Sequence, residues 1–341
     1  MTSPAVSVVI PTMNREALLP RAIDSVIAQT FTDWEIVLVD DGSTDGTPRV
    51  ARSYLDRLGD RFTYIPQDHR GSSAARNRGI EASRGRYVAF LDSDDEFLPE
   101  KLRRQVALFD ARPELGFVYS DFSVIDLNGA RRDSTFRTKF PLALEVPAER
   151  VSRGLYACRK NLFDTLVRGY FIATIVGMVR REVLGHRIRF DENQAYSEEW
   201  LFYLRVAYRC RSGFVDEPLA LHHVTPSSLA RQDKQRNTRR MYGLLRTLNA
   251  SFRDMNRGQR RAVSDQLART CRQIGYDAMS SGHYRRALEY AAKAWRYKPD
   301  ARATADVLNT LAECSVASIV SWRDKRTKTS IPIQSAVDVV R

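Results

Sequence analysis

The chain has 341 residues, 43% of them hydrophobic, which is enough for one large domain and a smaller one with packed cores. Its formal net charge is +13. Residues 1–229 hold 31 basic and 31 acidic side chains, whereas residues 230–341 hold 23 and 10, so the whole excess lies in the last third. No apolar run is long enough for a membrane helix and no signal-peptide pattern opens the sequence, so we expect a cytoplasmic chain.

The four cysteines fit the same expectation. They are widely separated and form no Cys-x-x-Cys pair, which is typical of free thiols in a cytosolic protein. They are Cys158, Cys210, Cys271 and Cys314.

The first 66 residues alternate between strand and helix patterns. Residues 6–10 and 36–39 are short apolar runs, typical of buried parallel strands. Residues 16–29 between them carry apolar side chains at helical spacing, residues 47–58 predict a second helix, and residues 62–65 predict a short strand. Alternating units of this kind predict an α/β fold with a mainly parallel sheet and right-handed crossovers.

Residues 71–79 follow as a small-residue helix start, and the apolar run 87–91 then ends in a group of carboxylates. The free N–H groups at such a helix start, with Arg76 nearby, favour an anion. Ligands of open parallel sheets bind just past the carboxyl ends of the strands. Asp92 and Asp94 are two positions apart, so in an extended segment their side chains point the same way.

Two interpretations of this acidic segment remain open. Adjacent carboxylates suit Mg²⁺ or Mn²⁺, which bind a few carboxylates together with substrate phosphates. The alternative is a solvated acidic turn before the next helix, near Pro99.

Four segments, in this order, resemble the family 2 glycosyltransferases of the GT-A fold: VSVVIPTMNR, VDDGSTDGT, GSSAARNRGI and YVAFLDSDDEF. The resemblance implies a Rossmann-like catalytic domain in residues 1–229. Residues 1–122 would be its nucleotide-sugar-binding part and residues 123–229 its acceptor-side part. Residues 230–341 would form a basic helical extension.

The resemblance also implies which residues bind the nucleotide sugar: Pro11, Thr12, Asn14, Arg15, Asp40, Arg76, Asn77, Asp92, Ser93 and Asp94. Asp40 would accept a hydrogen bond from uracil or another base. Asp94, with Asp92, would hold Mn²⁺ or Mg²⁺, which would bridge the donor phosphates and stabilise the leaving diphosphate. Three neighbours of Asp40 would only hold the turn and cap the next helix, namely Asp41, Ser43 and Asp45.

An inverting sugar transfer needs a carboxylate that takes the proton of the acceptor hydroxyl. Residues 189–205 resemble the family's FDE…EDxxLxxR segment, which places this base at Glu199, where Glu replaces the more usual Asp. Glu198 is expected to complement the helix dipole, and Asp191 is the next candidate base. Trp200 has two open interpretations, stacking on an acceptor sugar or packing in the core of its helix.

The segment 219–229 resembles the family's late segment near the diphosphate, but the His often found near Thr225 is absent. His222 or His223 would replace it as a phosphate or metal contact, or else serve a structural role at a strand end. The irregular pattern of residues 122–169 is expected on the acceptor side and identifies no acceptor.

The basic C-terminal region contains one segment, residues 269–300, that resembles a tetratricopeptide unit. A single unit cannot bury its own apolar face, so we expect it to pack on the catalytic domain or on a second copy of the chain. Residues 323–328 are a basic cluster, which indicates either peripheral contact with an anionic membrane at its inner face or a solvated helix. No nucleic-acid-binding module accompanies the charge.

The resemblance therefore implies a metal-dependent, inverting hexosyltransferase with a UDP-sugar donor. The acceptor would be a glycan, a lipid-linked sugar or a protein in polysaccharide, glycolipid or other glycoconjugate synthesis. A phosphatase with an aspartate nucleophile would have Thr or Val after Asp94, where Asp95 stands, and a dinucleotide oxidoreductase would need a GxGxxG after the first strand. A catalytically degenerate scaffold remains the alternative, because Glu replaces Asp at position 199.

Overall fold

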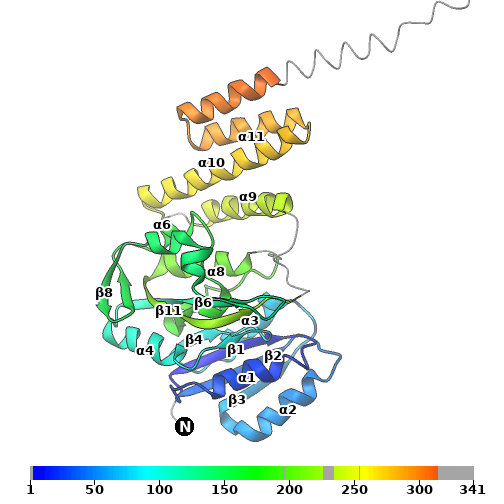
Figure 1. Cartoon of the computed structure of the whole chain (residues 1–341), viewed down its shortest axis with the longest axis vertical. Coiled ribbons are helices and arrows are strands. Elements are labelled where there is room, and N and C mark those ends of the chain that lie inside the picture. Colours follow the sequence, from blue (N-terminus) through cyan, green and yellow to red (C-terminus); the bar gives the residue numbers. More distant parts are fainter. Residues whose placement is uncertain (1–2, 195–196, 226–233, 253, 314–341) are drawn as a thin grey trace, which may run out of the picture. The chain divides into compact units, whose positions relative to one another are not determined.

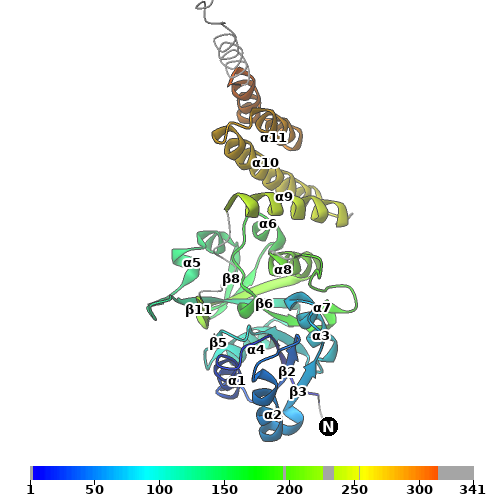
Figure 2. The same cartoon turned by 90° about the vertical axis from the view of Figure 1, so that its right-hand side faces the viewer.

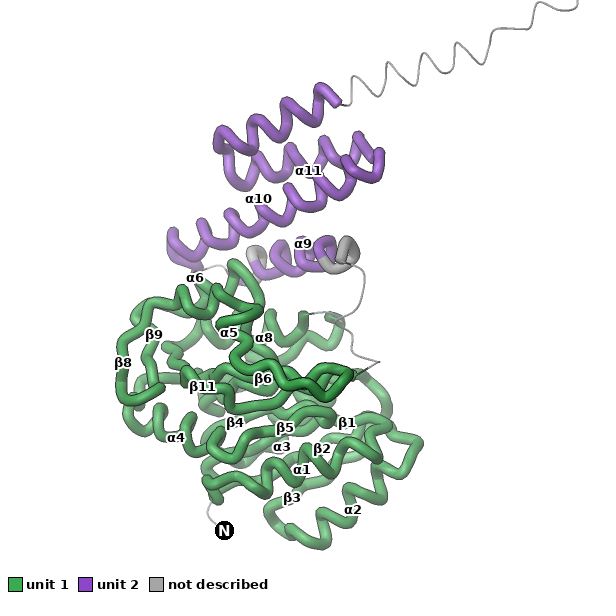
Figure 3. Tube along the Cα trace, in the orientation of Figure 1, with its two compact units in different colours: residues 1–231 green, residues 232–341 purple. Residues whose placement is uncertain are grey.

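The computed structural model describes residues 3–194, 197–225, 234–252 and 254–313. The chain divides into two compact units, residues 1–231 and residues 232–341 (Figure 3).

Unit 1 begins with a parallel sheet of four strands in the order β3-β2-β1-β4. The strands are β1 (Val6–Thr12), β2 (Trp34–Asp40), β3 (Phe62–Pro66) and β4 (Tyr87–Phe90). Every residue of β1, β2 and β4 is buried, as expected of parallel strands that are covered on both faces.

Three helices connect these strands: α1 (Leu19–Ile27), α2 (Thr47–Leu58) and α3 (Ser72–Ala82). The helices α1 and α2 lead from β1 out to β3, whereas α3 leads back to β4. Right-handed crossovers therefore place α3 on the opposite face of the sheet, as Figure 2 shows. A Cβ atom on Gly79 would lie 2.2 Å from Val9 Cγ1, so this glycine lets α3 pack closely on β1.

The second part of unit 1 extends the same sheet with β10, β6, β11, β9 and β8, in that order (Figure 1). Their bounds are β6 (Leu115–Ile125), β8 (Ala148–Ser152), β9 (Leu155–Cys158), β10 (Met178–Arg180) and β11 (Arg211–His223). β10 is antiparallel to β4 and β6, and β11 is parallel to β6. The mixed sheet, flanked by helices, confirms the predicted α/β class.

Two short strands lie off this path. β5 (Glu96–Phe97) pairs with the end of β11 and β7 (Arg131–Arg132) pairs with β6. Because β5 follows directly on the acidic segment after β4, its pairing ties that segment to the end of β11.

The remaining helical segments of unit 1 lie in the connections between its strands. They are η1 (Gly59–Arg61), α4 (Lys101–Ala111), α5 (Thr135–Thr138), η2 (Pro141–Glu145), α6 (Phe163–Leu166), η3 (Thr174–Val176), α7 (Arg181–Leu184) and α8 (Glu198–Arg209). α4 contacts β6 and β11, and α8 contacts α6 and α7.

The described residues of unit 2 are mostly helical, as predicted. It contains α9 (Lys234–Ser251), α10 (Arg257–Ser280), α11 (Tyr284–Tyr297) and a further helix over residues 301–313. Side chains of α10 and α11 bond the last helix, because Tyr276 Oη donates to Asp306 Oδ1 at 2.8 Å and Trp295 Nε1 donates to Thr304 Oγ1 at 3.2 Å.

Several predictions for unit 2 and its surroundings stay open. The tetratricopeptide resemblance and the division of residues 1–229 at residue 122 stay predictions, and the basic cluster 323–328 lies outside the described residues. None of the helices in the described ranges is long and apolar enough to cross a membrane. Three cysteines are unpaired thiols, Cys158, Cys210 and Cys271, while Cys314 is outside the described ranges.

A buried lysine lies at the start of α4. Lys101 is fully buried, its Nζ donates to Gln105 Oε1 at 2.7 Å, and the same atom lies 4.2 Å from the centre of the Phe97 ring. Burial lowers the pKa of Lys101 to about 7, because the charged amine loses its hydration. The unfolded chain therefore holds a proton between about pH 7 and 10.5 that the folded chain releases.

We predict that Lys101→Met stabilises unit 1, and that the gain is largest below pH 7 and shrinks as the pH rises toward 10. Each unit by which the pKa of Lys101 is lowered on folding destabilises the parent chain by about 1.4 kcal/mol while the amine is charged in the unfolded state. This destabilisation disappears once the pH is high enough for the amine to be neutral in both the folded and the unfolded state. Chemical denaturation between pH 6 and 10 measures the effect, with the exposed Lys160→Met as control. If the difference in free energy of unfolding between parent and variant stayed constant with pH, the lowered pKa of Lys101 would be contradicted.

Candidate active site

The candidate site lies where β1 and β4 are neighbours, because the order of the sheet reverses there. In open α/β sheets the crevice past the carboxyl ends of such strands is where ligands bind. Thr12 ends β1, Asp40 ends β2 and Asp92 follows β4 by two residues. Pro11 and Thr12 are buried, and no described residue bonds the hydroxyl of Thr12.

The loop after β1 is locked to the loop after β2. Asn14 adopts a left-handed backbone conformation (φ 52°), which asparagine tolerates better than most residues. Its N–H donates to Ser43 Oγ at 2.9 Å, and its Oδ1 accepts from the N–H of Thr44 at 2.8 Å. Asp45 Oδ1 accepts from the N–H of Thr47 at 2.9 Å, so Ser43 and Asp45 hold the turn as predicted, whereas the N-cap position of α2 is Gly46 and has no side-chain capping bond.

Asp40 is buried at the end of β2. Its two carboxylate oxygens accept hydrogen bonds from the N–H of Ser43 at 3.0 Å and from Tyr64 Oη at 2.9 Å. Only 2% of Asp40 is exposed, so a base would have to approach a carboxylate that already has two partners. The contact between Asp40 and a base stays a prediction.

Asp41 holds the segment that leads into α3. Its carboxylate accepts from the N–H groups of Arg70 and Gly71 at 2.8 and 2.7 Å, and from Gln67 Nε2 at 2.7 Å. Desolvation opposes the charged form, but these bonds together lower the pKa of Asp41. Asp41 therefore has a structural role, but it holds residues 67–71 before α3 rather than the predicted turn and cap at the start of α2.

Arg76 connects the segment after β4 with α8. Its guanidinium donates to Asp92 Oδ1 at 2.8 Å and to Glu198 Oε1 at 3.1 Å, and it lies 5.2 Å from the centre of the Phe190 ring. Only 5% of Arg76 is exposed; burial opposes its charge, but the two carboxylates raise its pKa. Glu198 is therefore more than a dipole-complementing acid, since it neutralises a buried cation.

Asn77 bonds the FDE segment, residues 190–192. Its Nδ2 donates to the carbonyl oxygen of Phe190 and to Glu192 Oε1, both at 3.0 Å, and its Oδ1 accepts from the N–H of Phe190 at 2.8 Å. Both N–H groups of the amide are used in these bonds. Asn77 thus has no free N–H for a nucleotide, and the structure gives it the role of holding Phe190.

Asp92 and Asp94 lie together, with Ser93 buried between them. Desolvation and the charge of Asp92 raise the pKa of Asp94, and Arg15 Nη2 offsets this effect only from 3.9 Å. No group of three or more His, Cys, Asp or Glu side chains in the described residues converges to hold an ion. A pair of carboxylates with residual negative charge fits Mg²⁺ or Mn²⁺, which take their other ligands from phosphates and water.

The end of β11 fixes this acidic segment from the other side. Asp95 is 1% exposed, its Oδ1 accepts from the N–H of His223 at 2.8 Å, and its Oδ2 lies 3.1 Å from His222 Nδ1. His223 Nε2 lies 2.7 Å from Glu96 Oε1. The structure therefore gives both histidines a structural contact, and direct phosphate or metal contact stays a prediction.

Sequence reasoning missed two residues of this arrangement. Asp95 forms the contacts with β11, and Arg21 Nη2 donates to the carbonyl oxygen of Asp94 at 2.5 Å. The role of Asp95 could have been suspected, because it continues the run of acidic residues after β4. Arg21 is one residue of the helical pattern of α1, and nothing in that pattern indicates a contact with Asp94.

Glu199 and Trp200 stand in the first turn of α8. Glu199 is half-buried, and burial, with the charge of Glu198 adding to it, raises the pKa of Glu199 to about 8. Trp200 is 1% exposed and its Nε1 donates to the carbonyl oxygen of Leu166 at 2.8 Å. Trp200 therefore packs in the core and has no free face for an acceptor sugar. Asp191, the other candidate base, lies 3.6 Å from Arg205 Nη2.

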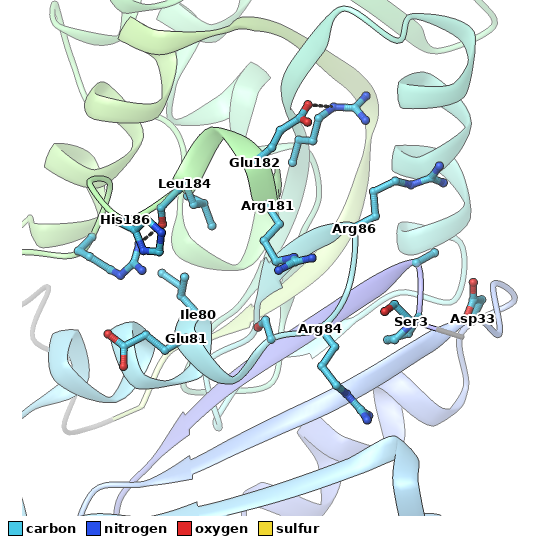
Figure 4. Close-up of a pocket in the computed structure, with 16 residues that line it drawn as sticks. Ser3, Asp33, Ile80, Glu81, Arg84, Arg86, Arg181, Glu182, Leu184 and His186 are labelled. Atoms are coloured by element: carbon cyan, nitrogen blue, oxygen red, sulfur yellow. Dashed lines mark hydrogen bonds and ion pairs between the residues drawn. The ribbon is translucent and has the colours of Figure 1, made fainter. Parts of the chain in front are cut away.

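A cavity of about 900 Å³ lies at the other edge of the sheet, where β1 and β4 begin. Figure 4 shows Arg181, Glu81 and His186 among the side chains around it. None of the residues predicted to bind the nucleotide sugar lines this cavity. The candidate site and this cavity are therefore separate.

Comparison with known proteins agrees with this geometry. The family model "Glycosyl transferase family 2" matches residues 7–165. The putative glycosyltransferase EpsH of Bacillus subtilis is 30% identical over 261 residues, which are 75% of this chain and 71% of EpsH. The chain belongs to glycosyltransferase family 2. The putative teichuronic acid biosynthesis glycosyltransferase TuaG of B. subtilis is 28% identical over 232 residues, 67% of this chain and 82% of TuaG.

Solved structures show that this family 2 glycosyltransferase has the predicted GT-A fold. S. aureus TarS 1-349 in complex with UDP-GlcNAc has a TM-score of 0.65 at 17% identity, covering 90% of this chain and 89% of that one. The mannosyltransferase PcManGT from Pyrobaculum calidifontis, in complex with GDP-Man and Mn²⁺, has a TM-score of 0.53 at 19% identity, covering 95% and 88%. The relatives are named as glycosyltransferases, and the chain is an enzyme of this class.

We predict that Trp200→Phe lowers the free energy of unfolding by about 1 kcal/mol, because it removes the 2.8 Å hydrogen bond to the carbonyl oxygen of Leu166, which then keeps only the N–H of Gly169 at 3.3 Å. Denaturant unfolding measures the loss, and Trp295→Phe is the comparison, which should lose less because the bond of Trp295 to Thr304 is exposed to solvent. Parent-like stability of Trp200→Phe would contradict the core role.

Proposed function

We propose that the enzyme transfers a sugar from a UDP-sugar to an acceptor hydroxyl with inversion, in the synthesis of a polysaccharide or another glycoconjugate. The observation that carries the proposal is the bridge made by Arg76, which joins Asp92 after β4 to Glu198 beside the candidate base. Through Arg76, the acidic segment after β4 is held close to the first turn of α8, which carries Glu199. The UDP-GlcNAc complex of TarS and the name of TuaG support the donor and the polysaccharide class.

The donor would lie along the ends of β1, β2 and β4. The buried hydroxyl of Thr12, which no described residue bonds, supports a contact there, since a buried polar group needs a partner. The other proposed contacts are Pro11, Asn14, Arg15, Asp40, Arg76 and Ser93. Arg15 and Arg76 would place positive charge beside the donor phosphates, where charge develops as the diphosphate leaves.

Asp94 and Asp92 would hold a divalent ion, Mn²⁺ or Mg²⁺. When bound, the ion would supply Lewis-acid stabilisation of the departing diphosphate. The Mn²⁺ complex of PcManGT and the residual negative charge at Asp94 support this assignment.

Glu199 would accept the proton of the acceptor hydroxyl as the new bond forms. Its raised pKa makes the carboxylate a stronger base, and it requires deprotonation before the reaction. A single displacement of this kind inverts the anomeric centre.

We predict that Asp94→Ala weakens Mn²⁺-dependent binding of UDP by at least about tenfold, which corresponds to about 1.4 kcal/mol. The ion would lose a carboxylate anchor, and the diphosphate charge would be less compensated. Titration calorimetry with UDP and Mn²⁺ measures the effect, with the distant Asp110→Ala as control. Equal affinity of the parent chain for UDP with Mn²⁺ and with a chelator would remove the metal from the proposal.

We predict that Glu199→Gln lowers the rate of transfer by about 10²–10⁴-fold while UDP binding stays near the parent value, because Gln cannot take a proton. In the parent enzyme the rate should rise with pH up to about 8, as Glu199 deprotonates. UDP release from a panel of UDP-sugars, with and without glycan acceptors, measures both effects.

The control for this variant is the exposed Glu182→Gln. Glu198→Gln is not a neutral control, because it removes one partner of the buried Arg76. A Glu199→Gln enzyme that transfers sugar at the parent rate would show that the base lies elsewhere, with Asp191 next.

We propose that the enzyme is cytoplasmic and contacts an anionic membrane surface through residues 230–341, which carry the whole charge excess. Co-sedimentation of the full chain with vesicles, with and without anionic lipid, should show binding that decreases with salt. Absence of salt-sensitive binding would contradict membrane contact and favour packing of the basic region on the catalytic domain or on a second copy of the chain. A size measurement in solution would distinguish these two, because only the second doubles the mass.

A further inference from the structure

One side of α1 is bonded to the backbone that follows the proposed metal ligands. Arg21 and Ser25 are on α1, and Gln29 follows its end by two residues. A spacing of four residues places the three side chains along one side of the helix, which packs against β5 (Figure 2). The backbone atoms that they bond, in the same order, are the carbonyl oxygen of Asp94, the N–H of Phe97 and the carbonyl oxygen of Leu98, at 2.5, 3.1 and 2.8 Å.

Arg21 is the member of this set that contacts the acidic segment, and its guanidinium is held from two sides. Nη2 donates to the carbonyl oxygen of Asp94, and Nε lies 3.4 Å from Glu96 Oε1. The same oxygen of Glu96 lies 2.7 Å from His223 Nε2, at the end of β11. Because a guanidinium presents its N–H groups in a rigid plane, contacts on two of its edges fix its orientation.

The backbone on either side of the Asp94 side chain is therefore restrained. The N–H of Asp95 donates to the carbonyl oxygen of Asp92 at 3.0 Å, which closes a tight turn, and the side chain of Asp95 bonds the end of β11. Arg21 adds a bond to the carbonyl oxygen of Asp94 itself. Since the direction of a Cα–Cβ bond follows from the backbone conformation, these bonds together set where the carboxylate of Asp94 can lie.

We infer that Arg21 is a positioning residue for the proposed metal site, in that its bond to the carbonyl oxygen of Asp94 directs the Asp94 carboxylate toward the ion. The inference rests on the proposed function, which makes Asp94 a metal ligand. Among the described residues, the carboxylate with which Arg21 forms an ion pair is that of Glu96, so Arg21 fixes Asp94 through its backbone. Partners that orient a metal ligand without touching the ion typically contribute about 10–100-fold to metal affinity.

The test compares the affinity of the full chain for UDP in the presence of Mn²⁺ and in the presence of a chelator, by titration calorimetry. The ratio of the two affinities measures what the ion contributes. Arg21→Met keeps most of the side-chain length but has no N–H group, and it should lower this ratio about tenfold. Its affinity for UDP in chelator should stay near the parent value, because the inference gives Arg21 no contact with the nucleotide. A parent-like ratio in Arg21→Met overturns the inference.

Ser25→Ala is the matched control, because it removes the neighbouring bond from α1 to the same segment. It should lower the free energy of unfolding in denaturant and leave the ratio at the parent value. A ratio as low as that of Arg21→Met would show that any loosening of the segment has this effect, which overturns a specific role of Arg21. A loss in Arg21→Met that is equal with Mn²⁺ and with chelator would show only a missing positive charge near the diphosphate, and it also overturns the inference.

Failure of the proposed function would give a different result. If the parent chain binds UDP equally well with Mn²⁺ and with chelator, or if Asp94→Ala keeps the parent ratio, the metal role of Asp94 is wrong. If Mn²⁺ strengthens UDP binding in the parent, Asp94→Ala loses that effect and Arg21→Met keeps it, only the present inference is wrong.

Arg21→Lys keeps the inference testable if Arg21→Met is poorly folded, because it retains the positive charge. One ammonium group does not reproduce the planar set of N–H donors, so the ratio should still fall below the parent value. In the Asp94→Ala background, Arg21→Lys should cause no further fall, since the carboxylate that it positions is gone. A parent-like ratio in Arg21→Lys, or additive losses in the double variant, overturns the inference.

Discussion

The buried guanidinium of Arg76 organises the candidate site. An unpaired charge at a buried position costs several kcal/mol, so this side chain requires Asp92 and Glu198 on either side of it. Because Arg76 is on α3, which Gly79 allows to approach β1, its position is set by the packing of the sheet. The segment after β4 and the first turn of α8 are both held to this one cation, and the geometry of the site follows from it.

The charges that remain after this pairing are arranged for different tasks. Asp92 is neutralised by Arg76, while Asp94 keeps much of its negative charge, since Arg15 is 3.9 Å away. Asp95 is tied to the end of β11 and fixes the acidic segment between two strands. On the α8 side, Arg76 holds Glu198, and Glu199 follows it in the same first turn of the helix. A site whose polar groups are held in advance by their own partners loses little energy to reorganisation during reaction.

The parts of this arrangement that follow from local patterns were predictable. Buried strands with helices between them gave the α/β class, and the strand end at Asp92 and Asp94 gave the acidic segment, because each depends on a few consecutive residues. The ion pair between Arg76 and Glu198 joins positions 122 residues apart, and the bonds from Asn77 to Phe190 join positions 113 apart. Such contacts depend on the tertiary packing of α3, which no local pattern encodes. Trp200 could not be assigned for the same reason, because its carbonyl partner lies on α6.

The strand order in the second half of the sheet could not be predicted from the sequence for a related reason. β10 lies between β4 and β6 although it follows β9 in the chain, and β11 pairs with three other strands, β5, β6 and β9. Short strands inserted out of chain order leave no periodic signal, so residues 122–169 gave an irregular pattern. The role of β11 in holding Asp95 is visible only once that order is known.

The central claim is that one site at the ends of β1 and β4 takes both the metal and the nucleotide. Crystals of the full chain grown with UDP and Mn²⁺ test it most directly through the anomalous scattering of manganese. We expect one strong anomalous peak between the diphosphate and the carboxylates of Asp94 and Asp92, with the base of UDP near the end of β2. A manganese peak elsewhere, or UDP bound at the cavity where β1 and β4 begin, would contradict it.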